Sequence, residues 1–309
     1  KALFLCRSFH LGRAIIKREK ITAVTCQDPF ESGLAGWLLA KIHRLPLQLQ
    51  VHTDVFSSYF AAESFKNKIR VLTAGFLLPR ATGIRVVSER IEQSLINKYP
   101  RLERKITVLS IYVDVKKIKS GKIKVDLRQK YPDHFPIILM ASRLSREKNI
   151  FLAVRAMASV IKKISGALLL VVGDGPELRK LKVESEKLKV KENVRFEPWT
   201  DDLPSYYKTA DLFLLVSNYE GYGRTVIEAM AAGLPVIMTD VGLANEILVD
   251  DLDGAVVPVG DEEALSDAVL KLASYKEKVG EFRENALKLL EKFPSKKDYL
   301  ESYKKALIM

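Results

Sequence analysis

Short apolar runs rich in β-branched residues alternate with segments of helical periodicity along most of this chain. Apolar runs in such an order form parallel strands whose two sheet faces are both covered by helices. The runs that predict strands are Ile21–Cys26, Leu47–His52, Ile84–Ser88, Ile106–Ser110, Pro136–Ser142, Ala167–Gly173, Val194–Pro198, Leu212–Ser217, Pro235–Asp240 and Gly254–Val259. Helices are expected between them, including Gly33–His43 and Asn67–Leu78. The alternation therefore predicts an α/β protein built on parallel sheets.

Length and one change in composition predict two domains. The chain has 309 residues, and a domain commonly holds roughly 100–200. The segment 116–136, "KKIKSGKIKVDLRQKYPDHFP", is polar and basic and is interpreted as the linker. We accordingly expect a first domain over residues 1–125, a second over 126–294, and an amphipathic C-terminal helix over 295–309 that returns to the first domain.

The positive charge is concentrated in the first part of the chain. Residues 1–134 hold 25 Lys and Arg against 11 Asp and Glu, whereas residues 135–309 hold 25 against 27. A basic half predicts an acidic partner, such as nucleic acid, anionic lipid headgroups or a phosphorylated substrate. The alternative is that these lysines are merely solvated and aid solubility.

Two cysteines, Cys6 and Cys26, form neither a metal-binding pattern nor a disulfide framework. Cys26 ends an apolar run, so a buried thiol in a reducing compartment is expected. No apolar run approaches the roughly 20 residues that a membrane-spanning helix needs.

Candidate binding residues follow the strands of the second half, because ligands of doubly wound sheets bind at the carboxyl ends of the strands. Arg143 and Lys148 flank a loop before a helix expected near Asn149, which is an arrangement suited to phosphate. They could equally be two surface cations. Gly173 and Gly175 permit a tight turn into a helix, but their spacing is not a dinucleotide-binding fingerprint.

The stretch "SNYEGYGRTVIEAMAAGLPVIMTD" carries two glutamates around a glycine-containing helix start. Gly221 and Gly223 allow the main chain to approach a ligand, and the helix is expected to begin near Thr225 with Glu228 in its first turn. Glu220 and Glu228 beside an anion site suit a ligand that carries hydroxyls as well as phosphates, as a nucleotide-sugar does. The alternatives are a helix-dipole role for Glu228 and a solvated loop acid at Glu220.

The acidic segment "VDDLDG" contains the pair Asp251 and Asp253, a spacing that some metal-dependent transferases use. Asp-Gly before a strand more often marks a turn, and no histidine or further acidic partner lies nearby in sequence. We therefore expect a turn and no metal.

The second half resembles the retaining glycosyltransferases of family 4. The resemblance rests on "ILMASRLSREKNI", "LLLVVGDGPEL", "VRFEPWTDDLPSYYKTADLFLLVSNYEGYGRTVIEAMAAGLPVIMTDVG" and "EILVDDLDGAVVPVGDEEAL", which cover most of 138–265 in the right order. Its signature, Glu-x7-Glu, is Glu220 to Glu228. The resemblance implies the GT-B architecture: two Rossmann-like, doubly wound parallel-sheet domains that face a cleft.

The resemblance also implies roles for individual residues. Glu220 would hold hydroxyls of the donor sugar, Glu228 would hold the ribose, and Arg143 and Lys148 would hold the diphosphate. The other donor-binding positions that it implies are Gly173, Pro198, Trp199, Gly221, Gly223, Arg224 and Thr225. The side chain of Arg224 departs from the pattern, since many relatives have an apolar residue there.

The first half is similar to the same family over shorter stretches. "QLQVHTDVF" resembles a strand that ends in a histidine facing the donor sugar, here His52, although a core or capping histidine is the alternative. "GIRVVSERI" resembles the strand that brings Ser88 and Glu89 to the acceptor side, although Ser88 could simply cap the next helix. Relatives begin with a strand and a glycine-rich loop that are not recognised before Ile21. The first domain is therefore expected to be an amino-terminally incomplete fragment, and a pared-down domain is the alternative.

The reaction that the resemblance implies is transfer of a hexose from a UDP- or GDP-linked sugar to a hydroxyl of a glycan or lipid-linked acceptor. It implies retention of configuration, no metal and no cofactor besides the donor. The basic first domain suggests an acidic acceptor or a membrane surface that carries a lipid-linked acceptor, so we expect a cytoplasmic enzyme that could associate peripherally with an anionic membrane. Two alternatives are a non-catalytic nucleotide-sugar-binding fragment and a basic nucleic-acid-binding module. Nucleic acid is not expected as a partner, because no helix-turn-helix, zinc-finger or RNA-binding signature is present.

Overall fold

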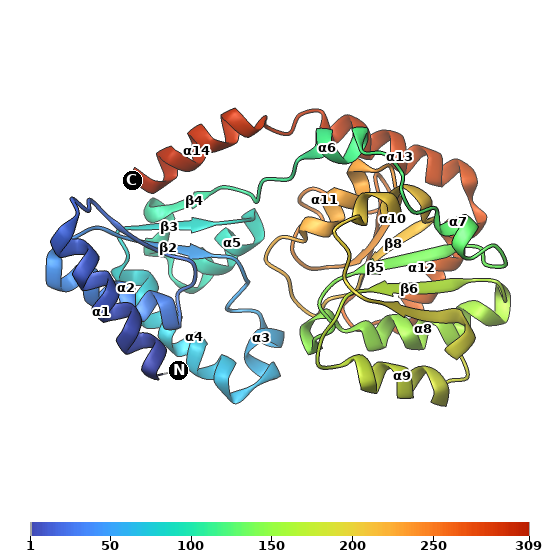
Figure 1. The fold of residues 1–309 in the computed structure, drawn as a ribbon, viewed down its shortest axis with the longest axis horizontal. Helices are drawn as coiled ribbons and strands as arrows, with labels where there is room; N and C mark the ends of the chain where they lie inside the picture. The colour runs from blue at the N-terminus through green and yellow to red at the C-terminus, as the bar shows by residue number, and fades with distance from the viewer. Residues whose placement is uncertain (1, 309) are drawn as a thin grey trace. The chain divides into compact units, whose positions relative to one another are not determined.

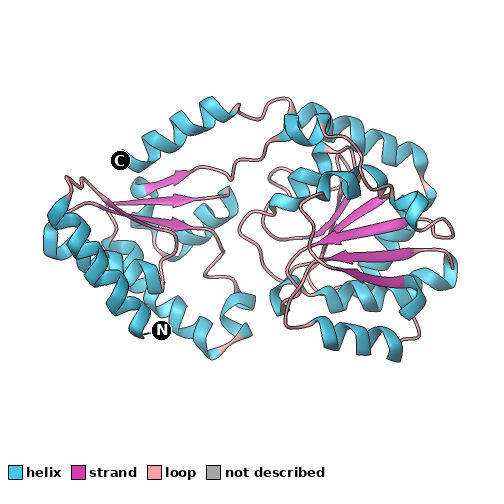
Figure 2. Cartoon of the chain, in the orientation of Figure 1, coloured by secondary structure: helices cyan, strands magenta, loops and turns pink. Residues whose placement is uncertain are grey.

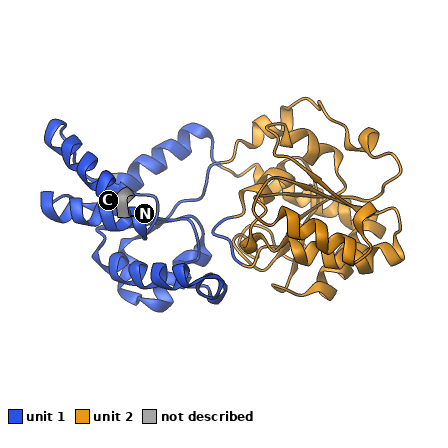
Figure 3. Ribbon diagram, turned by 60° about the horizontal axis from the view of Figure 1, so that its bottom comes forward, with its two compact units in different colours: residues 1–112, 219–222, 294–309 blue, residues 113–218, 223–293 orange. Residues whose placement is uncertain are grey.

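The computed structural model describes residues 2–308, and the chain divides into two compact units (Figures 1 and 3). Unit 1 contains residues 1–112, 219–222 and 294–309, and unit 2 contains residues 113–218 and 223–293. Each unit has its own parallel sheet with helices packed against it (Figure 2). Among the described residues, no helix combines the length and the apolar character needed to cross a membrane.

The sheet of unit 1 has four parallel strands in the order β1-β2-β3-β4. The strands are β1 (Val24–Cys26), β2 (Leu47–Val51), β3 (Gly83–Val86) and β4 (Ile106–Val108). The helices are α1 (Ala2–Arg18), α2 (Glu31–His43), α3 (Ser58–Glu63), α4 (Phe65–Leu77), α5 (Glu89–Lys98) and α14 (Lys296–Ile308), with 3-10 turns η1 (Leu78–Arg80) and η2 (Pro100–Lys105). Cys26 is buried, and burial, followed by the charge of Asp28, raises the pKa of its thiol to about 11.

The sheet of unit 2 has six parallel strands in the order β10-β9-β8-β5-β6-β7. The strands are β5 (Ile137–Ala141), β6 (Leu168–Val172), β7 (Val194–Glu197), β8 (Leu212–Leu215), β9 (Val236–Thr239) and β10 (Ala255–Val257). The helices are α6 (Val115–Ser120), α7 (Leu127–Lys130), α8 (Ile150–Lys163), α9 (Leu178–Lys187), α10 (Leu203–Thr209), α11 (Arg224–Ala231), α12 (Glu262–Ser274) and α13 (Lys276–Leu290), with 3-10 turns η3 (Arg146–Lys148) and η4 (Lys191–Asn193). The chain passes outward from β5 to β7 and then resumes on the other side of β5 with β8, so the strand order reverses between β5 and β8.

Every run that predicted a strand forms one, and each strand end lies within three residues of the predicted end. All residues of β5, β6 and β8 are buried, which explains why their sequences are continuously apolar rather than alternating. The predicted α/β class with parallel sheets is therefore confirmed.

The basic segment 116–136 is not a free linker, because it folds into α6 and α7 as part of unit 2. Ile118 and Leu127 are buried, and the backbone N–H of Lys124 donates to the hydroxyl of Ser205 at 2.9 Å. The units divide after Tyr112, whereas the sequence interpretation placed the boundary after residue 125. The segment is rich in lysine, so its average composition is that of a linker, although two of its apolar residues are buried in unit 2.

The helix α14 packs in unit 1 against polar side chains of β2 and β3. The amide of Gln50 donates to the hydroxyl of Tyr303 at 2.9 Å. Arg85 donates to the hydroxyl of Tyr299 at 3.2 Å, and its guanidinium lies 4.9 Å from the centre of the Tyr303 ring. Gln48 donates to the carbonyl oxygen of Ala306. Hydrogen bonds, a cation–π contact and the buried Ala306 together hold the C-terminal helix in unit 1.

Candidate active site

Two loops of unit 2 meet where its strand order reverses. One follows β5 and the other follows β8. The backbone N–H of Asn218 donates to the carbonyl oxygen of Glu147 at 2.8 Å, and the amide of Asn149 donates to the side-chain oxygen of Asn218 at 2.9 Å. The point of reversal at the carboxyl ends of the strands is where doubly wound sheets bind their ligands.

The turn after β6 brings its backbone against the loop after β5. Gly173 has φ of 145°, and a Cβ added there would collide with the carbonyl oxygen of Ser142. Glycine is therefore required at this position. The hydroxyl of Ser142 is buried and has no hydrogen-bond partner within the described residues. A buried polar atom without a partner is unusual and suits a ligand contact, yet sequence reasoning did not single out Ser142. Its position as the last residue of a predicted strand was the available signal.

The two predicted phosphate-binding cations lie in the loop after β5. The side chain of Arg143 is 72% exposed and pairs with Glu147 at 3.2 Å. An exposed ion pair of this kind contributes about 0–1 kcal/mol, so the guanidinium can exchange Glu147 for a stronger anion. Lys148 ends η3, and Asn149 follows it as the N-cap residue of α8, as expected.

The glycine-containing stretch begins α11 at Arg224, with Gly223 at φ of 95° as the N-cap residue. Thr225 is consequently the second residue of the helix. Glu228 lies in the second turn rather than in the first, which corrects the expectation from sequence. Helix-dipole effects fall off within the first turn, so a dipole role does not account for this glutamate.

Side chains hold the Glu228 carboxylate, which is only 9% exposed, from two sides. The hydroxyl of Tyr207 donates to it at 3.1 Å, and the Nε of Arg224 donates to it at 2.7 Å. Burial, followed by the charge of Glu228, raises the pKa of Tyr207 well above its ordinary value, so the phenol remains a proton donor. Sequence analysis missed Tyr207 because it lies on a different helix, α10, and only the fold brings it to Glu228.

Pro198 and Trp199 follow β7 directly. Trp199 is 52% exposed, and its backbone N–H donates to the Asp174 carboxylate at 3.4 Å. One oxygen of Asp202 nearby in sequence is buried and has no partner among the described residues. The exposed Trp199 ring offers a flat apolar surface directly after β7.

The first unit places His52 immediately after β2. The Nε2 atom of His52 is buried and finds no hydrogen-bond partner in the described part of the chain. Burial, followed by the positive charge of Arg85, lowers the pKa of this histidine below its ordinary value of 6.5. The imidazole is therefore neutral near pH 7.

Segment 219–222, which contains Glu220, packs within unit 1. The buried hydroxyl of Ser88 donates to the carbonyl oxygen of Gly221 at 2.9 Å and caps α5. A Cβ added at Gly221 would collide with the carbonyl oxygen of His52. Glu89 is exposed in the first turn of α5. The structure thus gathers His52, Ser88 and Gly221, and it assigns Glu220 and Glu228 to different units.

The pair Asp251 and Asp253 forms a turn, as the sequence predicted. Asp253 accepts a hydrogen bond from the backbone N–H of Val249 at 2.7 Å. Asp251 has φ of 58° and pairs with Lys271 at 3.3 Å and with Lys278 at 3.2 Å. Among residues 2–308, no three His, Cys, Asp or Glu side chains are grouped so that they could hold a metal ion.

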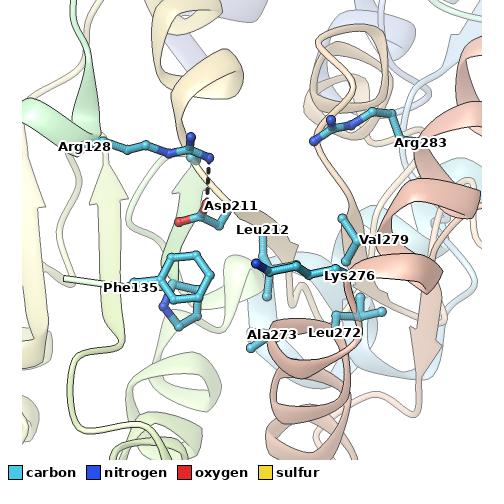
Figure 4. Close-up of a pocket in the computed structure, with 11 residues that line it drawn as sticks. Arg128, Phe135, Asp211, Leu212, Leu272, Ala273, Lys276, Val279 and Arg283 are labelled. Atoms are coloured by element: carbon cyan, nitrogen blue, oxygen red, sulfur yellow. Dashed lines mark hydrogen bonds and ion pairs between the residues drawn. The ribbon is translucent and has the colours of Figure 1, made fainter.

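A cavity of about 500 Å³ lies at the opposite, amino ends of β5 and β8 (Figure 4). Phe135 and Leu212 contribute to its apolar wall, and Arg128 pairs with Asp211 at 3.0 Å at its edge. None of the residues that the sequence predicted for a site lines it. The cavity is therefore separate from the strand ends described above.

Comparison with known proteins identifies the family. Residues 125–289 match the family described as Glycosyl transferases group 1, and residues 3–111 match the Glycosyl transferase 4-like domain. The chain belongs to the group 1 glycosyl transferases. It is 29% identical over 280 residues to alpha-monoglucosyldiacylglycerol synthase of Streptococcus pneumoniae, an alignment that covers 87% of this chain and 62% of that protein. This glycosyl transferase chain therefore spans less than two thirds of that relative's length.

A second relative is UDP-Gal:alpha-D-GlcNAc-diphosphoundecaprenol alpha-1,3-galactosyltransferase of Escherichia coli, with 25% identity over 85% of this chain and 69% of that protein. Among solved structures, HepE from Anabaena in complex with UDP has a TM-score of 0.81 at 20% identity and covers 98% of this chain and 82% of its own. Sucrose-phosphate synthase from Thermosynechococcus elongatus has a TM-score of 0.83 at 21% identity and covers 97% and 76%. These likenesses confirm the predicted GT-B fold.

Proposed function

We propose that this glycosyl transferase moves a hexose from a UDP- or GDP-linked sugar to a hydroxyl of a glycan or lipid-linked acceptor, with retention of configuration as in family 4. The observation that carries the proposal is the buried Glu228 carboxylate, which Tyr207 and Arg224 hold at the point where the strand order of unit 2 reverses. A carboxylate held in one orientation is suited to accept hydrogen bonds from the two hydroxyls of a ribose.

The diphosphate of the donor would lie between the turn after β6 and the start of α11. The Ser142 hydroxyl and the first N–H groups of α11 would supply donors there, and Gly173 lets the turn lie close to the loop after β5. Arg143 and Lys148 would add positive charge. As the bond to the nucleotide breaks, negative charge grows on the leaving diphosphate, and donors fixed in advance stabilise it most effectively.

The nucleotide base would stack on Trp199 beside Pro198, because that ring is exposed directly after β7. Glu220 and the neutral His52 would bind hydroxyls of the donor sugar. Support for a UDP-linked donor comes from neighbouring structures, since HepE of Anabaena was solved in complex with UDP-glucose. A relative of Mycobacterium tuberculosis is named as GDP-mannose-dependent, so the choice of base is a property to be measured.

In the proposed reaction the bond between the anomeric carbon and the diphosphate oxygen breaks, and the acceptor oxygen bonds to the same face of the sugar. The acceptor proton passes to an oxygen of the departing diphosphate. Glu220 and Glu228 act as hydroxyl binders, in contrast to the carboxylate nucleophile of a retaining glycosidase. The chain's own cations, rather than a metal, would stabilise the leaving group.

The acceptor would enter on the side of unit 1 that carries Glu89. Because the hydroxyl of Ser88 already bonds Gly221 and caps α5, we assign Ser88 the role of holding segment 219–222 in place. The basic charge of the first 134 residues and the lipid named in the pneumococcal relative support an acceptor at an anionic membrane surface, on the cytoplasmic side.

Calorimetric titration with UDP- and GDP-sugars, followed by assay of nucleotide diphosphate release, tests the proposal. Glu228→Ala should weaken the preferred donor about 10- to 100-fold, because hydrogen bonds to a charged group contribute about 1.5–3 kcal/mol. Glu192→Ala, at an exposed carboxylate of η4, is the control and should leave donor affinity unchanged.

Three outcomes separate the alternatives. Binding with turnover that depends on Glu228 supports the enzyme. Tight binding without turnover on any acceptor would make the chain a nucleotide-sugar binder. Failure of every donor to bind, together with binding of oligonucleotides, would overturn the proposal.

A further inference from the structure

Four large apolar side chains are exposed along α4 of unit 1. Phe65 is 78% exposed, Ile69 is 49%, Leu72 is 74% and Phe76 is 39%. Their spacing of four, three and four residues places them on one face of the helix. A contiguous apolar surface of this kind usually marks an interaction site, whereas scattered single apolar residues do not.

The rest of α4 is fixed by packing, so the exposure of this face is a property of the folded helix. Ser64 caps the helix by accepting a hydrogen bond from the N–H of Asn67 at 3.1 Å. Asn67, Ala74 and Leu77 are buried on the other side. The helix therefore has two apolar sides, and only one of them serves the core of unit 1.

The exposed face continues onto α2 through an aromatic contact. The rings of Phe76 and Trp37 meet edge to face, with centroids 5.1 Å apart. The guanidinium of Arg80 lies 3.9 Å from the centre of the Phe76 ring, and the ammonium of Lys41 lies 5.1 Å from that of Trp37. Cations thus border the apolar surface, and their stems can lie along it while the charges reach polar groups.

The charged side chains of α4 and of the turn after it are all positive. The segment 65–80 contains Lys66, Lys68, Arg70 and Arg80 and no acidic residue. Glu31 of α2 forms ion pairs with Lys66 at 3.4 Å and with Arg70 at 3.0 Å. One carboxylate therefore faces two of the four cations. The surface as a whole is therefore apolar along its centre and positive along its edges.

We propose that the apolar face of α4, with Trp37, docks this protein on an anionic lipid bilayer. An interfacial helix buries apolar side chains at the boundary between headgroups and acyl chains, while lysines and arginines reach anionic headgroups. Aromatic rings favour the same boundary. This surface deepens the proposed membrane-side acceptor, but it is distinct from the donor site and is tested without a donor.

Other occupants fit the surface less well. A two-fold contact between two copies of α4 would bring the same cations face to face, because such an interface repeats one patch on both subunits. Nucleic acid would satisfy the cations but would leave Phe65 and Leu72 without an apolar partner. An anionic bilayer satisfies both the apolar centre and the positive edge.

Vesicle sedimentation tests the proposal. The protein should bind vesicles of phosphatidylcholine with phosphatidylglycerol, bind phosphatidylcholine alone less well, and bind less as salt is raised. Leu72→Glu should reduce partitioning about tenfold or more, since it removes an apolar side chain from the boundary and adds a repelled charge. Leu300→Glu, on α14 with 54% exposure, is the matched control and should retain binding.

Fluorescence supplies a second measurement. Lipids brominated in the acyl chain should quench Trp37 in a Trp199→Phe background, whereas Trp199 should stay unquenched in a Trp37→Phe background. Absence of vesicle binding by the unsubstituted protein, or equal binding by Leu72→Glu and Leu300→Glu, would overturn the proposal. Light scattering that shows a dimer dissociated by Leu72→Glu would overturn it as well and would assign the face to a second copy of the chain.

Discussion

The two sheets of this protein are both parallel, but their interiors differ in chemistry. In unit 2, β5, β6 and β8 are buried and entirely apolar. In unit 1, β2 and β3 bury Gln48, Gln50 and Arg85 beside their apolar residues. Apolar packing tolerates many side chains of suitable volume, whereas a buried polar group is stable only with specific partners.

Arg85 shows what this difference requires. Its guanidinium donates to the amide oxygen of Gln50 at 2.7 Å and to the carbonyl oxygens of Leu109 and Ser110, each at 2.9 Å. With the bond to Tyr299 on α14, every contact joins a segment distant in sequence. The polar interior of unit 1 therefore makes its C-terminal helix part of its fold, and the comparison predicts that the two units respond differently to substitution.

The largest effect is expected from an apolar truncation in unit 2. Leu170→Ala on β6, at a fully buried position, should lower the free energy of unfolding of this unit by about 3 kcal/mol, through lost burial and a residual cavity. Hydrogen exchange in urea, resolved by peptide, measures each unit separately. Val183→Ala on α9, which is 43% exposed, is the control. An equal loss of protection in β2 and β6 would show that the units do not unfold separately.

A polar substitution should act mainly on unit 1. Arg85→Met keeps the volume of the side chain but leaves Gln50 and two carbonyl oxygens without their donor, so we expect a loss of about 2 kcal/mol. In the same exchange experiment, α14 should lose protection before β2 does. Arg101→Met changes an exposed arginine of the same unit and should have little effect. Retained protection of α14 in Arg85→Met would contradict the view that the contacts of Arg85 are needed to hold this helix.

The smallest effect is a pH dependence of unit 1. The pKa of His52 is lower in the folded chain than its ordinary value of 6.5, so the unfolded chain binds more protons and stability falls as the pH drops below about 6.5. His52→Gln should remove this part of the decline below about pH 6.5. Urea unfolding at a series of pH values measures it, and identical slopes for His52→Gln and the unsubstituted protein would refute it.

The sequence predicted the strands better than the segments between them. Continuous apolar runs are a strong signal, because a strand covered on both faces has no exposed positions to fill with polar residues. The segment 116–136 was misread because Ile118 and Leu127 are spaced among lysines. The average composition of this segment is dominated by its many exposed residues. Its packing against unit 2, however, depends on the few residues that are buried.

The candidate site was predictable where it follows strands and not where it depends on neighbouring elements. Gly173 and Glu228 were found from their positions next to apolar runs. Tyr207 was missed, since it reaches Glu228 from a separate helix. Glu228 was also placed in the first turn rather than the second, because α11 begins one residue earlier than predicted, directly after Gly223.

The sequence by itself determined the class of fold, the order of strands and helices, and the glutamates, glycines and cations of the candidate site. These follow from local periodicity and from residues adjacent in the chain. Only the tertiary structure decided that Tyr207 and Arg224 both hold Glu228, that Ser88 holds Gly221, and that α4 leaves an apolar face exposed. The physical reason is that burial and hydrogen-bond partners are properties of distant segments brought together, which a local pattern does not contain.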